Sequence, residues 1–253
     1  MRSKLTPLLT TFCLIALVAF VSGCSSDDSI DSGSKESTSS ESKATEETGY
    51  IKSLPVAFGE FDPATGKAGD FDFNAGEPTF NQIMIDYGYK VPGNSVGGEK
   101  TNPQPTIYLP LGTKVLSMVD GTVYDVPKLY SNDFSVMVQV EGSDLIFETE
   151  HVINATVKKG DKVKAGQVIA EVSDYDTRNT PGLGLVEFGV LKGGNPPSHL
   201  CPTDYFHSSV KEKLEKQITD LHVAWETFKT DDTIYDESAF AAPGCLSRDA
   251  VEG

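Results

Sequence analysis

Short apolar runs that alternate with polar residues dominate the chain from Ile107 to Leu191. Such alternation with a period of two is typical of strands that bury one face. Turn residues (Gly, Asn and Asp) separate the runs. The clearest of them are 115–123, 135–140, 145–152 and 186–191. The pattern predicts a mainly β fold with a sheet-based core.

A lysine-rich segment, Val157–Val172, lies inside this region and carries two glycine turns, Gly160 and Gly166. Its valines alternate toward one side while its lysines face the other. Glycine readily adopts the backbone angles that tight turns need. We therefore expect short strands that fold back on themselves in a compact β-sandwich or rolled sheet.

One helix is predicted, over Ser209–Phe228. Its apolar residues recur every three or four positions, which is the period of a helix with one buried face. They are Val210, Leu214, Ile218, Leu221, Trp225 and Phe228. We expect this stripe to pack on the sheet, with His222 beside it as an ordinary packing residue. Ser209 and Glu212 have the spacing of a capping box.

The chain before the β region has weaker signals. Ile51–Phe73 is predicted as short strands broken by turns, and Val91–Pro105, rich in Gly, Pro and Asn, as a loop. The sequence assigns no role to residues 51–104 or to the tail 231–253. Either segment could cover a cleft in the β region.

The first residues have the pattern of an export signal. Arg2 and Lys4 precede an apolar run, Phe12–Val21, that is too short to span a bilayer. The run ends in Val21-Ser22-Gly23-Cys24, which resembles a lipobox. That resemblance implies cleavage before Cys24 and lipid attachment to it. An ordinary signal peptide with a chance cysteine is the alternative.

Residues 25–49 are dense in Ser, Thr, Glu and Asp and contain no aromatic residue. Such a segment cannot bury enough apolar surface to fold, so it is predicted to be a flexible tether. The expected organisation is a signal peptide (1–23), the lipidated Cys24 with a disordered acidic tether (24–49), a β-rich domain with an N-terminal extension (50–206), and a C-terminal helix with its tail (207–253).

The formal net charge of −16 limits the possible partners. Nucleic acid is excluded as an expected partner because the chain lacks a basic stripe for phosphate neutralisation. Phosphates of lipids or wall polymers would also be repelled unless a cation bridged them. The expected membrane contact is therefore the lipid on Cys24.

The four cysteines have different expected fates. Cys13 leaves with the signal peptide and Cys24 takes lipid, so Cys201 and Cys245 remain in an oxidising compartment. The simplest interpretation is a disulfide between them that clamps the C-terminal tail. Two free thiols are the alternative.

The order of motifs in the β region resembles that of the lysostaphin-like peptidoglycan metalloendopeptidases. The motifs are Gly112-Thr113-Lys114-Val115, Asp120-Gly121-Thr122-Val123, and the sequence from Gly160 to Ile169. The resemblance covers about Pro105–Leu191 and implies the duplicated hybrid motif fold. Biotinyl domains, lipoyl domains and efflux adaptors share only the last motif.

Active members of that family bind zinc through a His with an Asp four residues later, and through a later His-x-His before an aromatic residue. Counting back from Gly112 places Thr101 and Pro105 near the first pair. Leu185-Val186-Glu187-Phe188 stands at the second motif. Only His151 matches a family histidine, the one that helps to stabilise the reacting species.

His151 and Glu187 are therefore the relic site candidates. They could rebuild a zinc site with a third group such as Glu148, Glu150 or His199. They could instead hydrogen-bond each other in a relic cleft without metal. His199 and His207, which flank Cys201, are better explained by a turn that leads into the helix.

Two functions follow from the resemblance. The first is a degenerate, non-catalytic module without a cofactor, anchored in the cell envelope on its periplasmic or exterior side, that binds cell-wall material or an envelope protein. The second is an active zinc endopeptidase with rearranged ligands. An adaptor-type transport protein is disfavoured because the chain lacks a long heptad hairpin.

Overall fold

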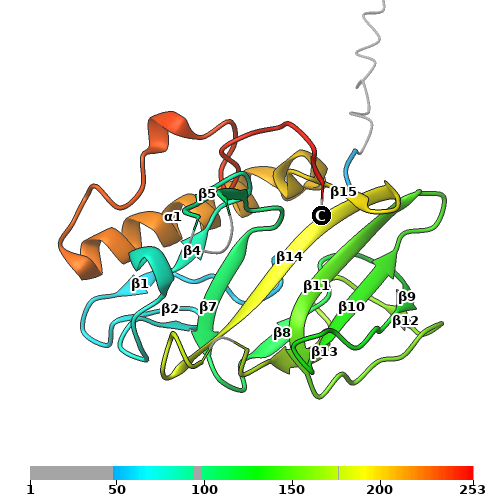
Figure 1. Cartoon of the computed structure of the whole chain (residues 1–253), viewed down its shortest axis with the longest axis horizontal. Coiled ribbons are helices and arrows are strands. Elements are labelled where there is room, and N and C mark those ends of the chain that lie inside the picture. The colour runs from blue at the N-terminus through cyan, green and yellow to red at the C-terminus, as the bar shows by residue number, and fades with distance from the viewer. Residues whose placement is uncertain (1–47, 94–97, 176, 253) are drawn as a thin grey trace, which may run out of the picture. The chain divides into compact units, whose positions relative to one another are not determined.

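The structure is a computed structural model that describes residues 48–93, 98–175 and 177–252, and a large antiparallel sheet dominates it (Figure 1). The predicted signal peptide, Cys24 and all but the last residues of the predicted tether lie outside the described residues. Within the described residues, no helix has the length and apolar character needed to cross a membrane.

The described residues contain sixteen strands, which lie in the N-terminal extension, the β region and the tail. The first six are β1 (Phe61–Asp62), β2 (Lys67–Ala68), β3 (Phe71–Asp72), β4 (Met84–Ile85), β5 (Lys90–Val91) and β6 (Lys100–Thr101). The next five are β7 (Thr106–Pro110), β8 (Lys114–Leu116), β9 (Gly121–Asp125), β10 (Phe134–Gln139) and β11 (Leu145–Ile153). The last five are β12 (Lys162–Val163), β13 (Val168–Val172), β14 (Leu183–Gly194), β15 (Pro197–Leu200) and β16 (Val251–Glu252).

One α-helix, α1 (Lys211–Lys229), follows the β region among the described residues. Three short 3-10 turns accompany these elements, at Thr79–Asn81, Pro202–Tyr205 and Glu237–Ala239. The mainly β fold with one C-terminal helix is confirmed.

The large sheet has the order β12-β9-β10-β11-β14-β15-β16, with β7 also paired to β14 and β13 also paired to β11. β14 is the longest strand, and Figure 1 shows it beside β11 in the middle of the sheet. Its residues are buried from Leu183 to Leu191 except at Glu187. A polar residue at the centre of an otherwise apolar strand marks the place where a site can form.

The N-terminal extension is part of the folded domain. β1, β2 and β3 form a small sheet, and β4 adds to the large sheet by pairing with β7. The predicted loop Val91–Pro105 contains one strand of a hairpin, since β5 pairs with β6. That prediction was wrong in part because Gly, Pro and Asn mark turns without showing whether the flanking residues pair.

Helix α1 begins two residues later than predicted, and the predicted capping box is wrong. Val210 is the N-cap residue, and no side chain caps the helix. The Ser209 hydroxyl instead hydrogen-bonds Nδ1 of His207 at 2.7 Å. A neighbouring imidazole thus competes for the hydroxyl that the spacing assigned to the backbone.

The apolar stripe of α1 is buried, as predicted, but it packs on the N-terminal extension. Trp225 meets Phe73 edge to face at 5.1 Å, and its indole N–H donates to the carbonyl of Asn81 at 2.8 Å. Gln217 donates to the carbonyl of Phe58. The extension therefore supplies the surface for the helix, a role that the sequence assigned to the sheet.

Cys201 and Cys245 form the predicted disulfide, with their Cα atoms 6.0 Å apart. Cys201 follows β15, and Cys245 belongs to the tail that returns to pair β16 with β15. A bridge that closes a loop of this length stabilises a fold by about 4 kcal/mol, mainly by restricting the unfolded chain. The disulfide therefore clamps the tail, as expected.

Candidate functional site

A β-bulge in β11 shapes the candidate site. Residues 134–136 of β10 pair with residues 149–152 of β11, so β11 has one residue more than its partner there. His151 lies in this bulge with φ of 59°, an uncommon value for a residue other than glycine. Bulges redirect side chains. Here the bulge lets the sequence neighbours Glu150 and His151 both approach Glu187.

His151 is held from two sides. Its Nδ1 lies 3.0 Å from Oδ2 of Asp133, and its ring stacks on that of Tyr175 with centroids 3.8 Å apart. Because a carboxylate accepts hydrogen bonds, Nδ1 carries the proton and Nε2 keeps its lone pair in the neutral ring.

Asp133 is in turn held by two serines. Ser173 donates to its Oδ2 at 2.7 Å, and Ser131 donates to its Oδ1. Burial by itself would raise the pKa of Asp133, but the hydrogen bonds from Ser131, Ser173 and His151 lower it overall. Asp133 is therefore a charged acceptor that fixes the orientation of the imidazole.

Two carboxyl groups face each other beside His151. Glu150 on β11 is the register partner of Glu187 on β14, and Glu187 is also the partner of Thr106 on β7. The Thr106 hydroxyl donates to Oε1 of Glu187 at 3.3 Å. Burial raises the pKa of Glu187 to about 7, and burial together with the charge of Glu148 raises the pKa of Glu150 to about 8.

A third carboxyl group, Glu148, lies deeper on the same strand. It accepts a hydrogen bond from the Ser135 hydroxyl at 2.7 Å, and burial raises its pKa. The amide of Gln104 donates to Glu148 at 3.4 Å and to Glu150 at 3.1 Å. Gln104 fits there because residue 189 is a glycine, whose missing Cβ would lie 2.6 Å from Oε1 of Gln104.

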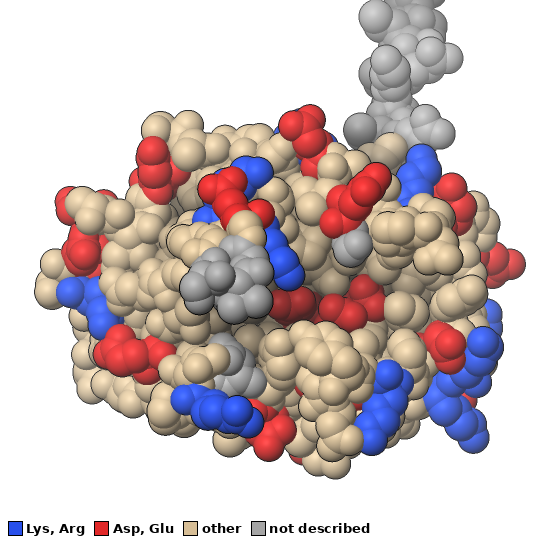
Figure 2. Space-filling model, in the orientation of Figure 1, with Lys and Arg blue, Asp and Glu red and all other residues tan. Residues whose placement is uncertain are grey.

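Glu150, His151 and Glu187 together form a group that could hold a metal ion, with one ligand atom from each and all three atoms within 4.8 Å of one another. Figure 2 shows acidic side chains at the floor of a hollow over β11 and β14. The structure thus brings together the two residues singled out from the sequence and adds Glu150 as the third. Glu148 and His199 do not belong to the group.

The positions expected for the family's first ligand pair do not carry zinc ligands. The structure shifts the expected pair by one residue. Thr106 rather than Pro105 faces Glu187, so Asn102 rather than Thr101 stands at the position four residues earlier. The side-chain amide of Asn102 donates to the carbonyl of Gln104 at 2.6 Å. Leu185 is buried in the place of the catalytic histidine. The residues at the family's ligand positions therefore do not form the family's zinc site, since Glu187, which replaces a histidine, is the one group among them that could bind a metal.

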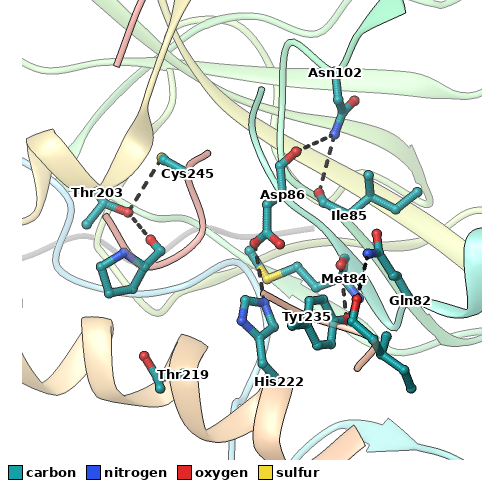
Figure 3. A network of polar contacts seen from close by, with 12 residues as sticks. Gln82, Met84, Ile85, Asp86, Asn102, Thr203, Thr219, His222, Tyr235 and Cys245 are labelled. Atoms are coloured by element: carbon teal, nitrogen blue, oxygen red, sulfur yellow. Dashed lines mark hydrogen bonds and ion pairs between the residues drawn. The ribbon is translucent and has the colours of Figure 1, made fainter. Parts of the chain in front are cut away.

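The other histidines lie away from this group. His199 is in β15 opposite Val251, and His207 bonds Ser209 as described. His222 is more than an ordinary packing residue. Figure 3 shows its buried Nε2 pointing toward Asp86, at 3.3 Å.

The sequence did not single out some of the site residues, or left them as one option among several, and these include Gln104, Asp133 and Glu150. Asp133 is in a turn-rich stretch and Gln104 is in a predicted loop. Their roles depend on the bulge and on the close approach of residue 189. No periodic signal in the sequence reports either feature.

Comparison with known proteins agrees with this architecture. Residues 105–197 match the family model described as Peptidase family M23. No curated protein matches the sequence of the chain.

Several solved structures are similar to part of the chain. Lysostaphin from Staphylococcus simulans is 19% identical over 44% of this chain and 43% of that chain, with a TM-score of 0.37. The catalytic domain of a prophage-encoded M23 protein from Enterococcus faecalis is 27% identical over 47% and 85%, with a TM-score of 0.37. A zinc-containing peptidase from Vibrio cholerae is 22% identical over 60% and 39%, with a TM-score of 0.40. The chain thus spans less than half the length of lysostaphin.

Proposed function

Residues 105–197 match the family model described as Peptidase family M23, and from this match we propose that the domain is catalytically degenerate and works as a binding or regulatory module in the cell envelope. The observation that carries the proposal is the replacement of the expected site residues. Asn102 and Thr106 stand in place of the first ligand pair, and Leu185 stands in place of the catalytic histidine.

Hydrolysis of a peptide bond needs an activated water and a group that takes its proton. A leucine at position 185 can do neither. His151 is the imidazole that remains at the site, and its Nδ1 is engaged by Asp133. A site with one imidazole and partly protonated carboxyl groups is poorly suited to metal-assisted hydrolysis but well suited to holding a polar ligand.

The rim of the site supports a binding role. Tyr130 is 88% exposed, and its hydroxyl lies 2.9 Å from that of Tyr175, which stacks on His151. Exposed tyrosines offer a ring for packing and a hydroxyl for hydrogen bonding. The ligand that we propose is cell-wall material or an envelope protein.

We propose further that a lipid on Cys24 holds the chain in the membrane, with residues 24–49 as the tether and the domain on the periplasmic or exterior side. Support for this comes from the apolar run Phe12–Val21 and the lipobox-like end of the signal segment. The proposed module has no nucleic-acid partner. Because it is non-catalytic, it needs no cofactor for a reaction.

Two measurements on purified peptidoglycan test the module. The zinc-supplemented chain should release no soluble wall fragments above a buffer control, and it should sediment with insoluble wall material. A Tyr130→Ala variant should sediment at least about three times more weakly. Release of wall fragments by the parent chain would show that the domain is a hydrolase.

The second candidate function is an active metal-dependent endopeptidase with rearranged ligands, which the group of Glu150, His151 and Glu187 favours. In that case Glu187 would bind the metal and His151 would assist the attack by water. A Glu187→Ala His151→Ala variant distinguishes the two candidates, because it would abolish any hydrolysis that the parent chain shows.

A further inference from the structure

We propose that Glu150, His151 and Glu187 bind one divalent transition-metal ion, through a ligand set shifted away from the positions that the family uses. The inference deepens the proposed function, because it rests on the same cleft and names what the cleft holds. It does not require hydrolysis.

The first support is the convergence of three different strand positions. Glu150 and His151 come from β11 and Glu187 from β14, and their ligand atoms lie within 4.8 Å of one another. Three protein ligands with an open position are the usual arrangement of a non-structural metal site. Small rotations of the two carboxyl groups suffice to close the remaining distance to a bound ion.

The second support is the state of the imidazole, which is independent of the carboxyl groups. His151 is 4% exposed, and its ring hydrogen bonds to Asp133 and Ser131 are both made at Nδ1. Its Nδ1 is held by Asp133 at 3.0 Å. A histidine that binds a metal through one nitrogen commonly donates from the other to a carboxylate, which fixes its tautomer and orientation. With Nδ1 engaged by Asp133, Nε2 is the ring nitrogen left to bind an ion.

The third support is the charge around the site. Glu150 and Glu187 are register partners on adjacent strands, and like charges placed directly opposite each other destabilise a sheet. No Lys or Arg side chain forms an ion pair with either group among the described residues. A bound divalent cation would neutralise both carboxylates at once.

The donor set indicates the kind of ion. One imidazole with two carboxylates suits zinc or manganese, whereas calcium and magnesium prefer oxygen ligands alone. Glu150 and Glu187 keep part of their surface exposed, so an ion held between them remains open to solvent. Its free position would accept an anionic group, which the acidic surface of the chain otherwise repels.

The test is a titration of the full chain, stripped with a chelator, with Zn²⁺ and with Mn²⁺. Isothermal calorimetry gives the affinity, and plasma mass spectrometry gives the metal content after dialysis. The parent should take up one more ion per chain than a Glu150→Gln Glu187→Gln variant, which reports any binding elsewhere on the chain. Each single variant should bind at least about thirtyfold more weakly.

Two further variants separate this site from general charge effects and from misfolding. Asp133→Asn should weaken binding by about 10- to 100-fold, because Asp133 positions the imidazole without touching the ion. Glu171→Gln removes a half-buried carboxylate from neighbouring β13 and should leave the affinity unchanged. Fluorescence of the buried Trp225 verifies that each variant is folded.

Equal metal uptake by the parent and the double variant would overturn the proposal, as would affinity weaker than about 1 mM. Neither result bears on catalysis, because hydrolysis is not measured. Conversely, hydrolysis of peptidoglycan by the metal-loaded chain would agree with this metal site. It would overturn the proposal that the domain is non-catalytic.

Discussion

Glu150 on β11 lies directly opposite Glu187 on β14, so two carboxyl groups share one position across the sheet. Burial raises the pKa of Glu150 to about 8 and that of Glu187 to about 7. The folded state therefore holds protons that the unfolded chain releases near pH 4.5. Retaining these protons stabilises the folded state. The stabilisation is complete below pH 4.5 and is lost as the pH rises through 7 and 8.

In the presence of a chelator, Glu150→Gln should raise the free energy of unfolding relative to the parent. This gain should be about 2 kcal/mol larger at pH 9 than at pH 5. Urea unfolding followed by Trp225 fluorescence measures the difference. Glu171→Gln is the control, because hydrogen bonds from Lys114 and Asn154 lower the pKa of that carboxyl. An equal effect of Glu150→Gln at both pH values would refute the assignment.

The buried pair of Asp86 and His222 should be important for stability. Both side chains are almost fully buried, and His222 also stacks on Tyr235 at 4.0 Å. Removing one member of a buried pair leaves the other without compensation. We expect His222→Ala to lower the free energy of unfolding by about 3 kcal/mol in urea titrations. Lys216→Ala, which breaks an exposed pair on the same helix, should cost less than about 0.5 kcal/mol. Similar losses in the two variants would contradict this ranking.

Gly184 is required by the close approach of another strand. A Cβ at this position would lie 2.0 Å from the backbone carbonyl oxygen of Ser173, which cannot move away as a side chain could. Gly184→Ala should therefore destabilise the domain by at least about 2 kcal/mol. Gly193 is on the same strand with open space around it, so Gly193→Ala should change the melting temperature little. A melting temperature for Gly184→Ala within a degree of the parent would show that the backbone yields at this point.

Cys24 is predicted to carry the lipid anchor. In a bacterial expression host that processes lipoproteins, Cys24→Ala should move the chain from the membrane fraction to the soluble fraction and abolish labelling with radioactive palmitate. Cys13→Ala is the matched control, because Cys13 lies within the segment that is removed. Membrane association of the Cys24→Ala variant equal to that of the parent would rule out lipid anchoring at this residue.

Much of the fold was predictable because period-two alternation survives in the long strands. The runs 135–140 and 145–152 correspond closely to β10 and β11. The run 115–123 was predicted as one segment, but the structure divides it into two strands, β8 and β9. The sequence did not show this division because the turn between the two strands contains no glycine.

The site was predictable only in part. His151 and Glu187 could be found because each occupies a motif position, although they are 36 residues apart. The bulge that turns His151 inward leaves no trace in the alternation, since Glu148, Glu150 and His151 read simply as a polar stretch of a strand. Thr106 was missed by one residue, because a count from Gly112 cannot show which residue the pairing of β7 with β14 sets opposite Glu187.

The lengths of the outer strands restrict how this domain can recognise a partner. In the described part of the large sheet, the strands that pair on one side alone are β4, β8, β12 and β16, and each has two or three residues. Such short borders offer too few free backbone groups for an extended peptide to add itself as a further strand. Recognition must then depend on side chains that project from the broad face of the sheet, so specificity can evolve by substitution at individual face positions without changing the backbone.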